Sequence, residues 1–306
     1  MYIATFNEYL RKRFGHKLYK LALDGGMTCP NRDGTLGTRG CIFCLDGSGS
    51  FAERRCGSIT EQLTAAKARL HGKDGAECGY IAYFQSYTNT YATAERLRVL
   101  FTEAIEAPGV EVLSIATRPD CLPDETVALL AELNAIKPVW VELGLQTVSD
   151  ETARLIRRGY ELPVFDDAVQ RLNRAGIETI AHVIFGLPGE TREDMLRTVR
   201  HVAGLPIQGV KLQLLHILHG TDLYDMYMSG EVRPLEPDEY FNLLSDAIEL
   251  LPRDMVIHRL TGDGDKRSLA APLWSADKKR VRADMERFFA ARDTEQGRAY
   301  TPVSVS

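Results

Sequence analysis

The sequence predicts an α/β fold: a partial, TIM-like (β/α)6 barrel with a C-terminal α+β extension. Short apolar segments alternate with amphipathic helical segments about six times along the chain. The apolar segments are rich in β-branched and aromatic residues, which is typical of strands buried in a parallel sheet. Six strand–helix units are fewer than the eight of a closed barrel, so we expect an open-sided barrel, with an open doubly wound sheet as the alternative.

The expected strands are short and precede the expected helices in turn. In chain order the strands are Lys17–Asp24, Tyr80–Gln85, Val110–Thr117, Val139–Gln146, Ile177–Gly186 and Gly209–Ile217. The helices are Ile59–Leu70, Thr93–Ile105, Asp124–Leu133, Val164–Ala175 and Arg192–Val202. Both barrels and doubly wound sheets bind ligands at the carboxyl ends of their strands. We therefore expect the functional site there.

The regular alternation stops after about Leu218. Helical patterns follow at Thr221–Met228, Pro237–Leu251 and Asp277–Ala291, with one further strand pattern at Val256–Leu260. We therefore expect a core over residues 1–220 and a C-terminal extension over residues 221–306 that packs on this core.

Composition limits the class of protein. The 306 residues are 44% hydrophobic and 26% charged, which is ordinary for a globular chain. The first residues lack the apolar centre of a signal peptide, and no apolar run is long enough for a membrane helix. We therefore expect a cytoplasmic protein with no membrane partner.

The charge is acidic overall, at −5, but two clusters of basic residues lie near the ends of the chain. They are Arg11, Lys12, Arg13, His16, Lys17 and Lys20, and then Lys266, Arg267, Lys278, Lys279, Arg280, Arg282 and Arg287. The clusters are either two solvated helix faces or a surface that follows a phosphate backbone.

The most informative segment is the glycine-rich loop at residues 24–51, which holds Cys29, Cys41 and Cys44. It follows the first expected strand, so it lies at the ligand-binding edge. A structural zinc ion or a [4Fe–4S] cluster usually takes four protein ligands, so three cysteines on one loop indicate a metal with an open position. The alternative is a zinc loop whose fourth ligand is distant, such as Cys56 or a histidine.

The loop sequence CPNRDGTLGTRGCIFC resembles that of radical S-adenosylmethionine (SAM) enzymes, which place an aromatic residue before their last cysteine. The spacing of eleven residues between Cys29 and Cys41 departs from the common three, but it is similar to the Elongator-subunit-3-like branch, of the YhcC/YtqA type. Other stretches of the chain that carry the resemblance are ATRPDCLPD, VELGLQT, HVIFGLPGET, LHGTDLY, HRLTGDG, APLWS and RDTEQG.

The resemblance implies a radical SAM barrel in which Cys29, Cys41 and Cys44 each ligate one iron of a [4Fe–4S] cluster, while the fourth iron binds SAM. The residues that it places against SAM lie on the loop, at strand ends or on the helix after the fourth strand: Phe43, Gln85, Ser86, Gln146, Arg158 and His182. Glu142 is added on physical grounds, because it shares a strand face with Gln146 and a buried acid needs a partner.

The resemblance also implies an electron donor of the flavodoxin or ferredoxin type, and tRNA as the substrate. The reaction that it implies converts 5-carboxymethylaminomethyluridine at the wobble position to 5-aminomethyluridine. The alternatives are a radical SAM enzyme acting on a small metabolite or a protein, and a non-catalytic zinc or iron–sulfur module. His216 and His219 are candidates for the substrate side, and no catalytic residue is assigned.

The remaining cysteines have no clear place in this scheme. Cys78 and Cys121 border expected strands and are interpreted as idle thiols. Cys56 follows the loop closely and is a minor candidate for sulfur or second-cluster chemistry. The sequence does not predict the oligomeric state.

Overall fold

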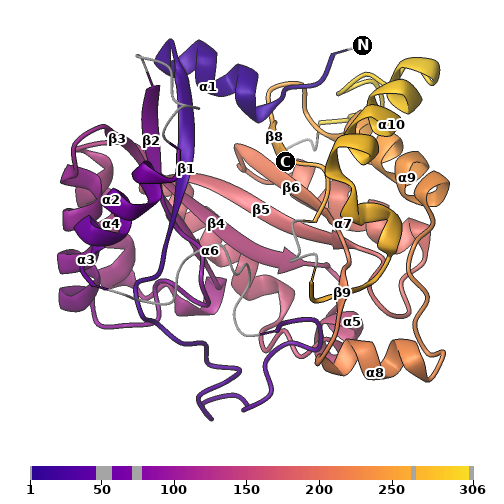
Figure 1. Ribbon diagram of the computed structural model, residues 1–306, viewed down its shortest axis with the longest axis horizontal. Coiled ribbons are helices and arrows are strands. Elements are labelled where there is room, and N and C mark those ends of the chain that lie inside the picture. The colour runs from indigo at the N-terminus through magenta and orange to yellow at the C-terminus, as the bar shows by residue number, and fades with distance from the viewer. Residues whose placement is uncertain (1, 46–56, 71–77, 263–266, 303–306) are drawn as a thin grey trace.

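A single curled sheet of seven parallel strands organises the protein and confirms the predicted partial barrel. The computed structural model describes residues 2–45, 57–70, 78–262 and 267–302, and Figure 1 shows the sheet with helices packed around it. The strand order is β1-β2-β3-β4-β5-β6-β8. Their bounds are β1 Lys17–Leu23, β2 Cys78–Phe84, β3 Val110–Thr117, β4 Val139–Gln146, β5 Glu178–Phe185, β6 Gly209–Leu214 and β8 Val256–Arg259.

Helices cover the outer face of the sheet and bury most of the apolar side chains. The helices between the first six strands are α2 Ile59–Ala68, α3 Ala94–Glu106, α4 Asp124–Asn134, α5 Asp150–Leu155, α6 Leu162–Arg174 and α7 Arg192–Ala203. Side-chain caps fix where several begin: Ser58 and Glu61 form a capping box at α2, and Thr191 and Asp194 form another at α7. The periodicity did not predict α5, and Arg158, expected on the helix after the fourth strand, lies in the turn between α5 and α6.

The residues after the sixth strand extend the sheet. They form α8 Asp222–Met228, α9 Pro237–Leu250 and α10 Lys278–Ala291, and a small antiparallel sheet of β7 Ile217–Leu218 and β9 Leu269–Ala271. Strand β8 pairs in parallel with β6, and Lys211 lies opposite Arg259. The strand predicted at Val256–Leu260 is thus the seventh strand of the main sheet.

An amino-terminal helix, α1 Phe6–Phe14, lies at the edge where the strands begin. It begins at the cap Thr5 and ends at Gly15, whose φ of 78° suits glycine. Its Leu10 packs with Trp140 and other residues of the inner sheet face. The helix therefore closes the half-barrel at the edge opposite the cysteine loop, which Figure 1 shows at the lower edge.

Both ends of the chain are tied together by Gln296, which is fully buried. Its side-chain oxygen accepts a hydrogen bond from the Ala4 amide at 2.8 Å, and its amide nitrogen donates to the carbonyls of Pro252 and Met255. The RDTEQG stretch thus joins the chain ends to the turn before β8. None of the helices in the described part of the chain has the length and apolar character needed to cross a membrane.

Candidate active site

A cavity of about 280 Å³ lies at the carboxyl ends of the strands, where the sequence predicts the site. The cysteine loop, six strands of the main sheet and β7 contribute to its lining. Among the predicted residues, the cavity is lined by Cys29, Cys41, Cys44, Phe43, Gln85, Glu142, Gln146, Arg158, His182 and His216. Ser86 is half-buried next to Gln85 and is not among the lining residues. His219 is exposed and packs its ring on Tyr224 with centroids 4.7 Å apart.

Ile42 anchors the tip of the cysteine loop. Its amide donates to the carbonyl of Ile156 at 3.2 Å, and its carbonyl accepts from the amide of Leu223 at 2.9 Å. Its side chain is buried in a small apolar cluster with Ile184 and Leu187. Ile42 is thus held in this cluster, while its neighbour Phe43 lines the cavity together with Cys41 and Cys44.

The long spacing between Cys29 and Cys41 folds as an internally bonded turn. The Gly40 amide donates to the Asn31 carbonyl at 2.8 Å, and the Arg32 amide donates to the Cys29 carbonyl at 2.8 Å. Gly40 has a φ of 72°, and a Cβ there would lie 2.9 Å from the Arg32 side chain. The eleven residues therefore return the chain to the cavity, which accounts for the unusual spacing.

Asn31 connects this turn to the first sulfur position of the CIFC segment. Its side-chain amide donates to the carbonyl of Arg157 at 2.7 Å and lies 3.5 Å from the Sγ of Cys41. Asn31 itself is buried. An amide N–H directed at a cysteine sulfur stabilises thiolate, which is the form that binds iron.

The three cysteines line the same cavity, which fits an iron–sulfur cluster. A cubic cluster places each cysteine on a separate iron. Burial, with the neighbouring Cys44 and Cys29 thiols, raises the pKa of Cys41 to about 11, so the free thiol stays protonated until a metal displaces the proton. Cys56 lies outside the described residues.

Gln146 has two features that fit contact with an organic ligand. It ends β4 with a φ of 68°, which is rare for a residue other than glycine. Its Oε1 is buried and has no hydrogen-bond partner among the described residues. Since buried polar atoms are normally paired, a hydroxyl or amine of a bound ligand fits this atom. Both features suit the contact with SAM that the sequence analysis assigned to it.

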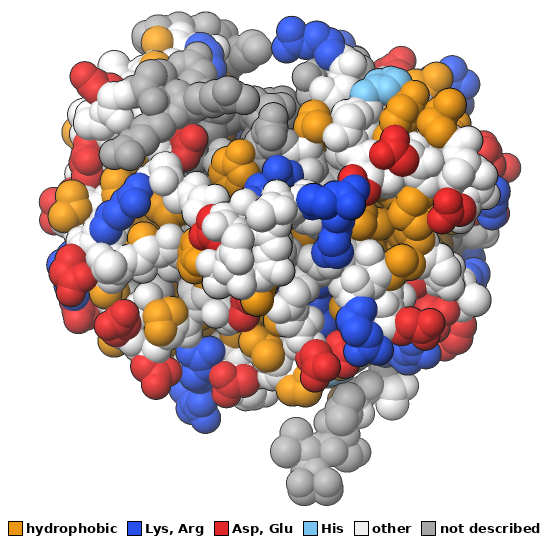
Figure 2. Space-filling model, turned by 90° about the horizontal axis from the view of Figure 1, so that it is seen from below, with side chains coloured by type: hydrophobic (Ala, Val, Ile, Leu, Met, Phe, Trp, Pro, Cys, Tyr) orange, Lys and Arg blue, Asp and Glu red, His pale blue; other side chains and the backbone are white. Residues whose placement is uncertain are grey.

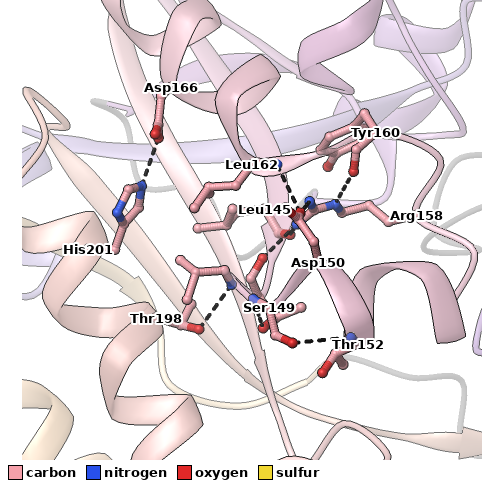
Figure 3. A network of polar contacts seen from close by, with 12 residues as sticks. Leu145, Ser149, Asp150, Thr152, Arg158, Tyr160, Leu162, Asp166, Thr198 and His201 are labelled. Carbon is pink, nitrogen blue, oxygen red and sulfur yellow. Dashed lines mark hydrogen bonds and ion pairs between the residues drawn. The ribbon is translucent and has the colours of Figure 1, made fainter.

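Arg158 holds the end of β4 in place (Figure 3). Its Nη1 donates to the carbonyls of Leu145 at 3.0 Å and Thr147 at 2.6 Å, and its Nε donates to the Tyr160 carbonyl at 2.9 Å. Its Nη2 lies 3.1 Å from the Asp150 carboxylate. Four of the five N–H groups therefore bond to the protein, so Arg158 shapes the turn that carries Gln146 and has one N–H left for a ligand.

Glu142 lies at the floor of the cavity and is completely buried. Its Oε1 accepts from Lys20 at 2.9 Å and from Ser114 at 3.1 Å. Its Oε2 accepts from Tyr83 at 2.8 Å, lies 2.9 Å from His182 Nε2 and pairs with Lys211. Glu142 lies on the same strand face as Gln146, as predicted. Its carboxylate has five hydrogen-bond or ion-pair partners in the protein and orients the cations around it.

The charges in this network follow from its partners. Burial alone would raise the pKa of Glu142, but the Lys20 and Lys211 ammonium groups and the bond from His182 hold it well below its usual range. Burial and the Lys211 charge lower the pKa of His182 to about 4, so its imidazole is neutral at neutral pH. The floor of the cavity thus contains one carboxylate between two ammonium groups.

Several lining residues were missed by the sequence analysis, including Tyr83, Arg118, Lys211 and Arg259. A lysine inside the apolar strand GVKLQL is a signal that could have revealed Lys211, because such a charge needs a buried partner. Arg118 follows β3 and pairs with Asp120 at 2.7 Å. Of the other cysteines described, neither Cys78 nor Cys121 lines this cavity.

The two basic clusters occupy different parts of the molecule. Arg11, Lys12 and Arg13 of the first cluster belong to α1, at the edge where the strands begin, and Arg13 and His16 pair with Glu178 and Glu111. Lys278 at the start of α10 is close enough to Arg259 for their charges to interact. Figure 2 looks onto the cavity edge and shows Lys and Arg side chains near the middle of the face, among apolar ones. Lys20 of the first cluster lies on β1 and pairs with Glu142 of the cavity lining, and Lys278 of the second cluster lies near Arg259 of the same lining.

Comparison with known proteins identifies the class. The radical SAM superfamily matches residues 34–202, and the radical SAM C-terminal domain matches residues 207–288. The chain belongs to the radical SAM superfamily. It is therefore an enzyme that uses SAM and a [4Fe–4S] cluster, as the sequence predicts. The first match includes Cys41 and Cys44 and begins after Cys29.

Its relatives lie in the Elongator-like branch. The chain is 44% identical to the YtqA protein of Bacillus subtilis (strain 168) over 97% of its own length and 92% of that protein. It is 28% identical to a tRNA uridine(34) acetyltransferase of Methanocaldococcus infernus, over 49% of this chain and 28% of that one. The solved structure of Methanocaldococcus infernus Elp3 shares the fold, with a TM-score of 0.69 and 18% identity over 91% of this chain and 64% of that chain.

Proposed function

We propose that this enzyme modifies the wobble uridine of tRNA, converting 5-carboxymethylaminomethyluridine to 5-aminomethyluridine. The observation that carries the proposal is that the cysteine loop, Gln146 and the charged residues around Glu142 line the same cavity. The similarity to a tRNA uridine(34) acetyltransferase over about half the chain supports tRNA as the substrate. The net reaction breaks the bond between the side-chain nitrogen and the carboxymethyl carbon, with SAM as the two-electron oxidant and water as the second reactant, so that the two-carbon group leaves as glyoxylate.

The loop is proposed to hold the cluster through Cys29, Cys41 and Cys44. When bound, the cluster and SAM supply a 5′-deoxyadenosyl radical that takes a hydrogen atom from the substrate. Asn31 orients and stabilises the Cys41 sulfur, while Phe43 offers an apolar ring to the adenine. Gln146 presents its unpaired oxygen to a ligand hydroxyl or amine.

The walls of the cavity position the ligands and exclude water. Arg158 and Tyr160 fix the turn after β4, because Tyr160 donates to the Gly144 carbonyl and its ring lies 4.6 Å from the Arg158 guanidinium. The neutral His182 and the saturated Glu142 keep the floor rigid. Such preorganisation places a substrate atom against the reacting group without rearrangement of the protein.

A cysteine series tests the cofactor assignment. After anaerobic reconstitution, Cys29→Ala, Cys41→Ala and Cys44→Ala should each lose the cluster and the release of 5′-deoxyadenosine on reduction. Cys78→Ala, whose thiol does not line the cavity, serves as the matched control and should retain both. Full iron content and turnover in any of the three variants would exclude that cysteine as a ligand.

A nucleoside analysis tests the substrate. Digested tRNA from a deletion strain should accumulate 5-carboxymethylaminomethyluridine and lack 5-aminomethyluridine and any nucleoside derived from it. Purified enzyme should then convert the accumulated base in that tRNA. Unchanged wobble nucleosides in the deletion strain, together with SAM cleavage by the purified enzyme, would redirect the search to a small metabolite or a protein substrate.

A further inference from the structure

The turn that follows β4, at residues 147–149, is held by two groups of contacts. The first comes from Arg158, which donates to the carbonyls on both sides of Gln146. The second comes from α7 and from the segment that joins β5 to α7. There the hydroxyl of Thr198 accepts a hydrogen bond from the Val148 amide at 3.2 Å. Because Gln146 directly precedes the turn, both groups of contacts fix the place of its side chain.

Glu190 adds a charged contact to the second group. It lies two residues before α7, and its carboxylate accepts a hydrogen bond from the hydroxyl of Thr147, which is fully buried. The Thr147 oxygen in turn accepts the Ser149 amide at 3.0 Å. The hydroxyl of Thr152 on α5 also bonds to the Glu190 carboxylate. One carboxylate therefore joins the turn after β4 to α5.

Glu190 influences the cavity through these elements and not by contact with a ligand. Among the residues that the structure describes, those that line the cavity include Gln146 but not Glu190. Helix α5 leads on to the cysteine loop, since the carbonyl of Ile156, which caps this helix, accepts the Ile42 amide at 3.2 Å. A displacement of the turn or of α5 would thus reach residues that line the cavity.

The ionisation of Glu190 depends on these surroundings. Burial raises the pKa of Glu190 to about 7, and the Asp194 carboxylate adds to this, whereas the two threonine hydroxyls and the Arg197 guanidinium lower it. The charged residues of the neighbouring α5 are Asp150, paired with Arg158, and the exposed Glu151 and Arg154. A charged acceptor forms hydrogen bonds about twice as strong as those of a neutral one. The carboxylate form therefore holds the two hydroxyls more firmly than the protonated form does.

We propose that Glu190 is a positioning residue of the SAM site, which in its carboxylate form holds the turn through Thr147 so that Gln146 presents its side-chain oxygen to SAM. The Oε1 of Gln146 is buried and has no partner among the described residues, so a shift of the turn changes the one bond that this atom can make to a ligand. The inference rests on the SAM contact of Gln146 within the proposed function and does not depend on the substrate.

The test compares SAM binding at two pH values. The equilibrium affinity for SAM is measured anaerobically with the reconstituted, unreduced enzyme, in which SAM is not cleaved. Glu190→Gln, which keeps the shape of the side chain without its charge, should weaken binding about tenfold at pH 8. At pH 6, where the wild-type carboxyl group is itself mostly protonated, the same variant should weaken binding less than about twofold. Titration of SAM itself affects both proteins equally and cancels in this ratio.

A double variant tests whether Glu190 acts through Gln146. In a Gln146→Ala protein, Glu190→Gln should cause little further loss of affinity at pH 8, because the residue that it positions is gone. Glu193→Gln, exposed in the first turn of α7, is the matched control and should bind SAM as the wild type does at both pH values. Iron content and the unfolding midpoint of each variant report on its structural integrity.

Three results would overturn the inference. They are a wild-type affinity of Glu190→Gln at pH 8, an equal loss at pH 6 and pH 8, which indicates a structural role alone, and an undiminished loss in the Gln146→Ala protein. Wild-type affinity of Gln146→Ala itself would overturn both the SAM contact and the inference. Failure of the enzyme to convert tRNA would instead overturn the proposed substrate alone, because SAM binding is measured without tRNA.

Discussion

At the scale of single residues, the buried carboxylate of Glu142 controls the electrostatics of the cavity floor. It is fully buried, and its two oxygens meet five partners from β1, β2, β3, β5 and β6. The strands converge on this atom pair because each contributes one inward-facing polar side chain. Removing such a buried carboxylate costs far more folding free energy than removing one partner of an exposed ion pair. The cations lose their counter-charge where water cannot replace it.

Replacing Glu142 with Gln should lower the free energy of unfolding by about 3 kcal/mol, since Lys20 and Lys211 then repel each other without a carboxylate between them. Urea titration followed by circular dichroism measures the loss. The double variant Glu142→Gln with Lys211→Met should recover part of it, because one of the two ammonium groups is gone. A single variant as stable as the wild type would show that the lysines do not depend on this carboxylate.

His216 makes stability depend on pH. Its pKa falls from 6.5 to about 4 on folding because of burial and the nearby Lys278 and Arg259, so the unfolded chain takes up the proton first as pH falls. The contribution of His216 is complete above about pH 6.5 and is lost towards pH 4, at up to about 1.4 kcal/mol per pH unit. Urea titrations at pH 7 and 5.5 should show a shallower pH dependence in His216→Gln. Equal slopes in the two proteins would contradict the shift.

The sequence predicted the cavity's acids and amides better than its cations. Glu142 and Gln146 were found together because strand alternation places them on one face. Lys211 and Arg259 were missed because their importance depends on which strands become neighbours, and the pairing of β6 with β8 joins segments far apart in the sequence. Arg158 bonds mainly to the protein, since the turn after β4 has carbonyls that need donors, and its contact with SAM stays a prediction.

At the scale of elements, Ile42 anchors the CIFC end of the cysteine loop. Ile42 carries two backbone bonds and a buried side chain, while Leu36 in the same loop is 54% exposed. The loop therefore owes its shape to a few contacts with α5 and α8 and to its own internal turn. Loops with few buried contacts open before the rest of a domain does.

Ile42→Ala should weaken the binding of the cluster by the loop, because truncating a buried isoleucine to alanine costs about 2–5 kcal/mol of folding free energy. The reconstituted variant should lose iron to a chelator several-fold faster than the wild type, with the absorbance of the cluster as the readout. Leu36→Ala, which changes an exposed apolar residue of the same loop, is the matched control. Identical loss rates for Ile42→Ala and Leu36→Ala would show that the anchor does not limit cluster retention.

The first six strands were predictable, because each is short, apolar and followed by a helical pattern. Helix α1 was not, since FNEYLRKRF has a majority of polar residues and forms a helix by packing Leu10 and the rings of Phe6, Tyr9 and Phe14 against the inner face of the sheet. The strand at Val256–Leu260 was recognised, but its place in the main sheet depends on a partner 47 residues earlier, Gly209 opposite Val256.

At the scale of the whole molecule, the two chain ends are structural parts of one body. Gln296 has a completely buried side chain that bonds to backbone groups of Ala4, Pro252 and Met255. The backbone N–H of Gln296 also donates to the Tyr2 carbonyl at 2.9 Å. The first and last described segments are thus joined over nearly the full length of the sequence.

Gln296→Leu should lower the free energy of unfolding by about 2–4 kcal/mol, because it leaves one buried and two partly buried backbone groups without their partners. The decrease is measured by urea titration. The same change at Gln170, which is exposed on α6, should alter stability by less than about 0.5 kcal/mol. Equal effects at both positions would mean that solvent reaches the groups around Gln296.

The seventh strand also bears on how this enzyme can be divided. A fragment ending near residue 220 would lack β8 and leave the N–H and C=O groups along one side of β6 without their pairing strand. An unpaired strand edge of this kind pairs with other chains, so we expect such a fragment to self-associate rather than remain functional. Truncation of the protein to its first six strands would therefore expose an aggregation-prone strand edge and also delete Arg259.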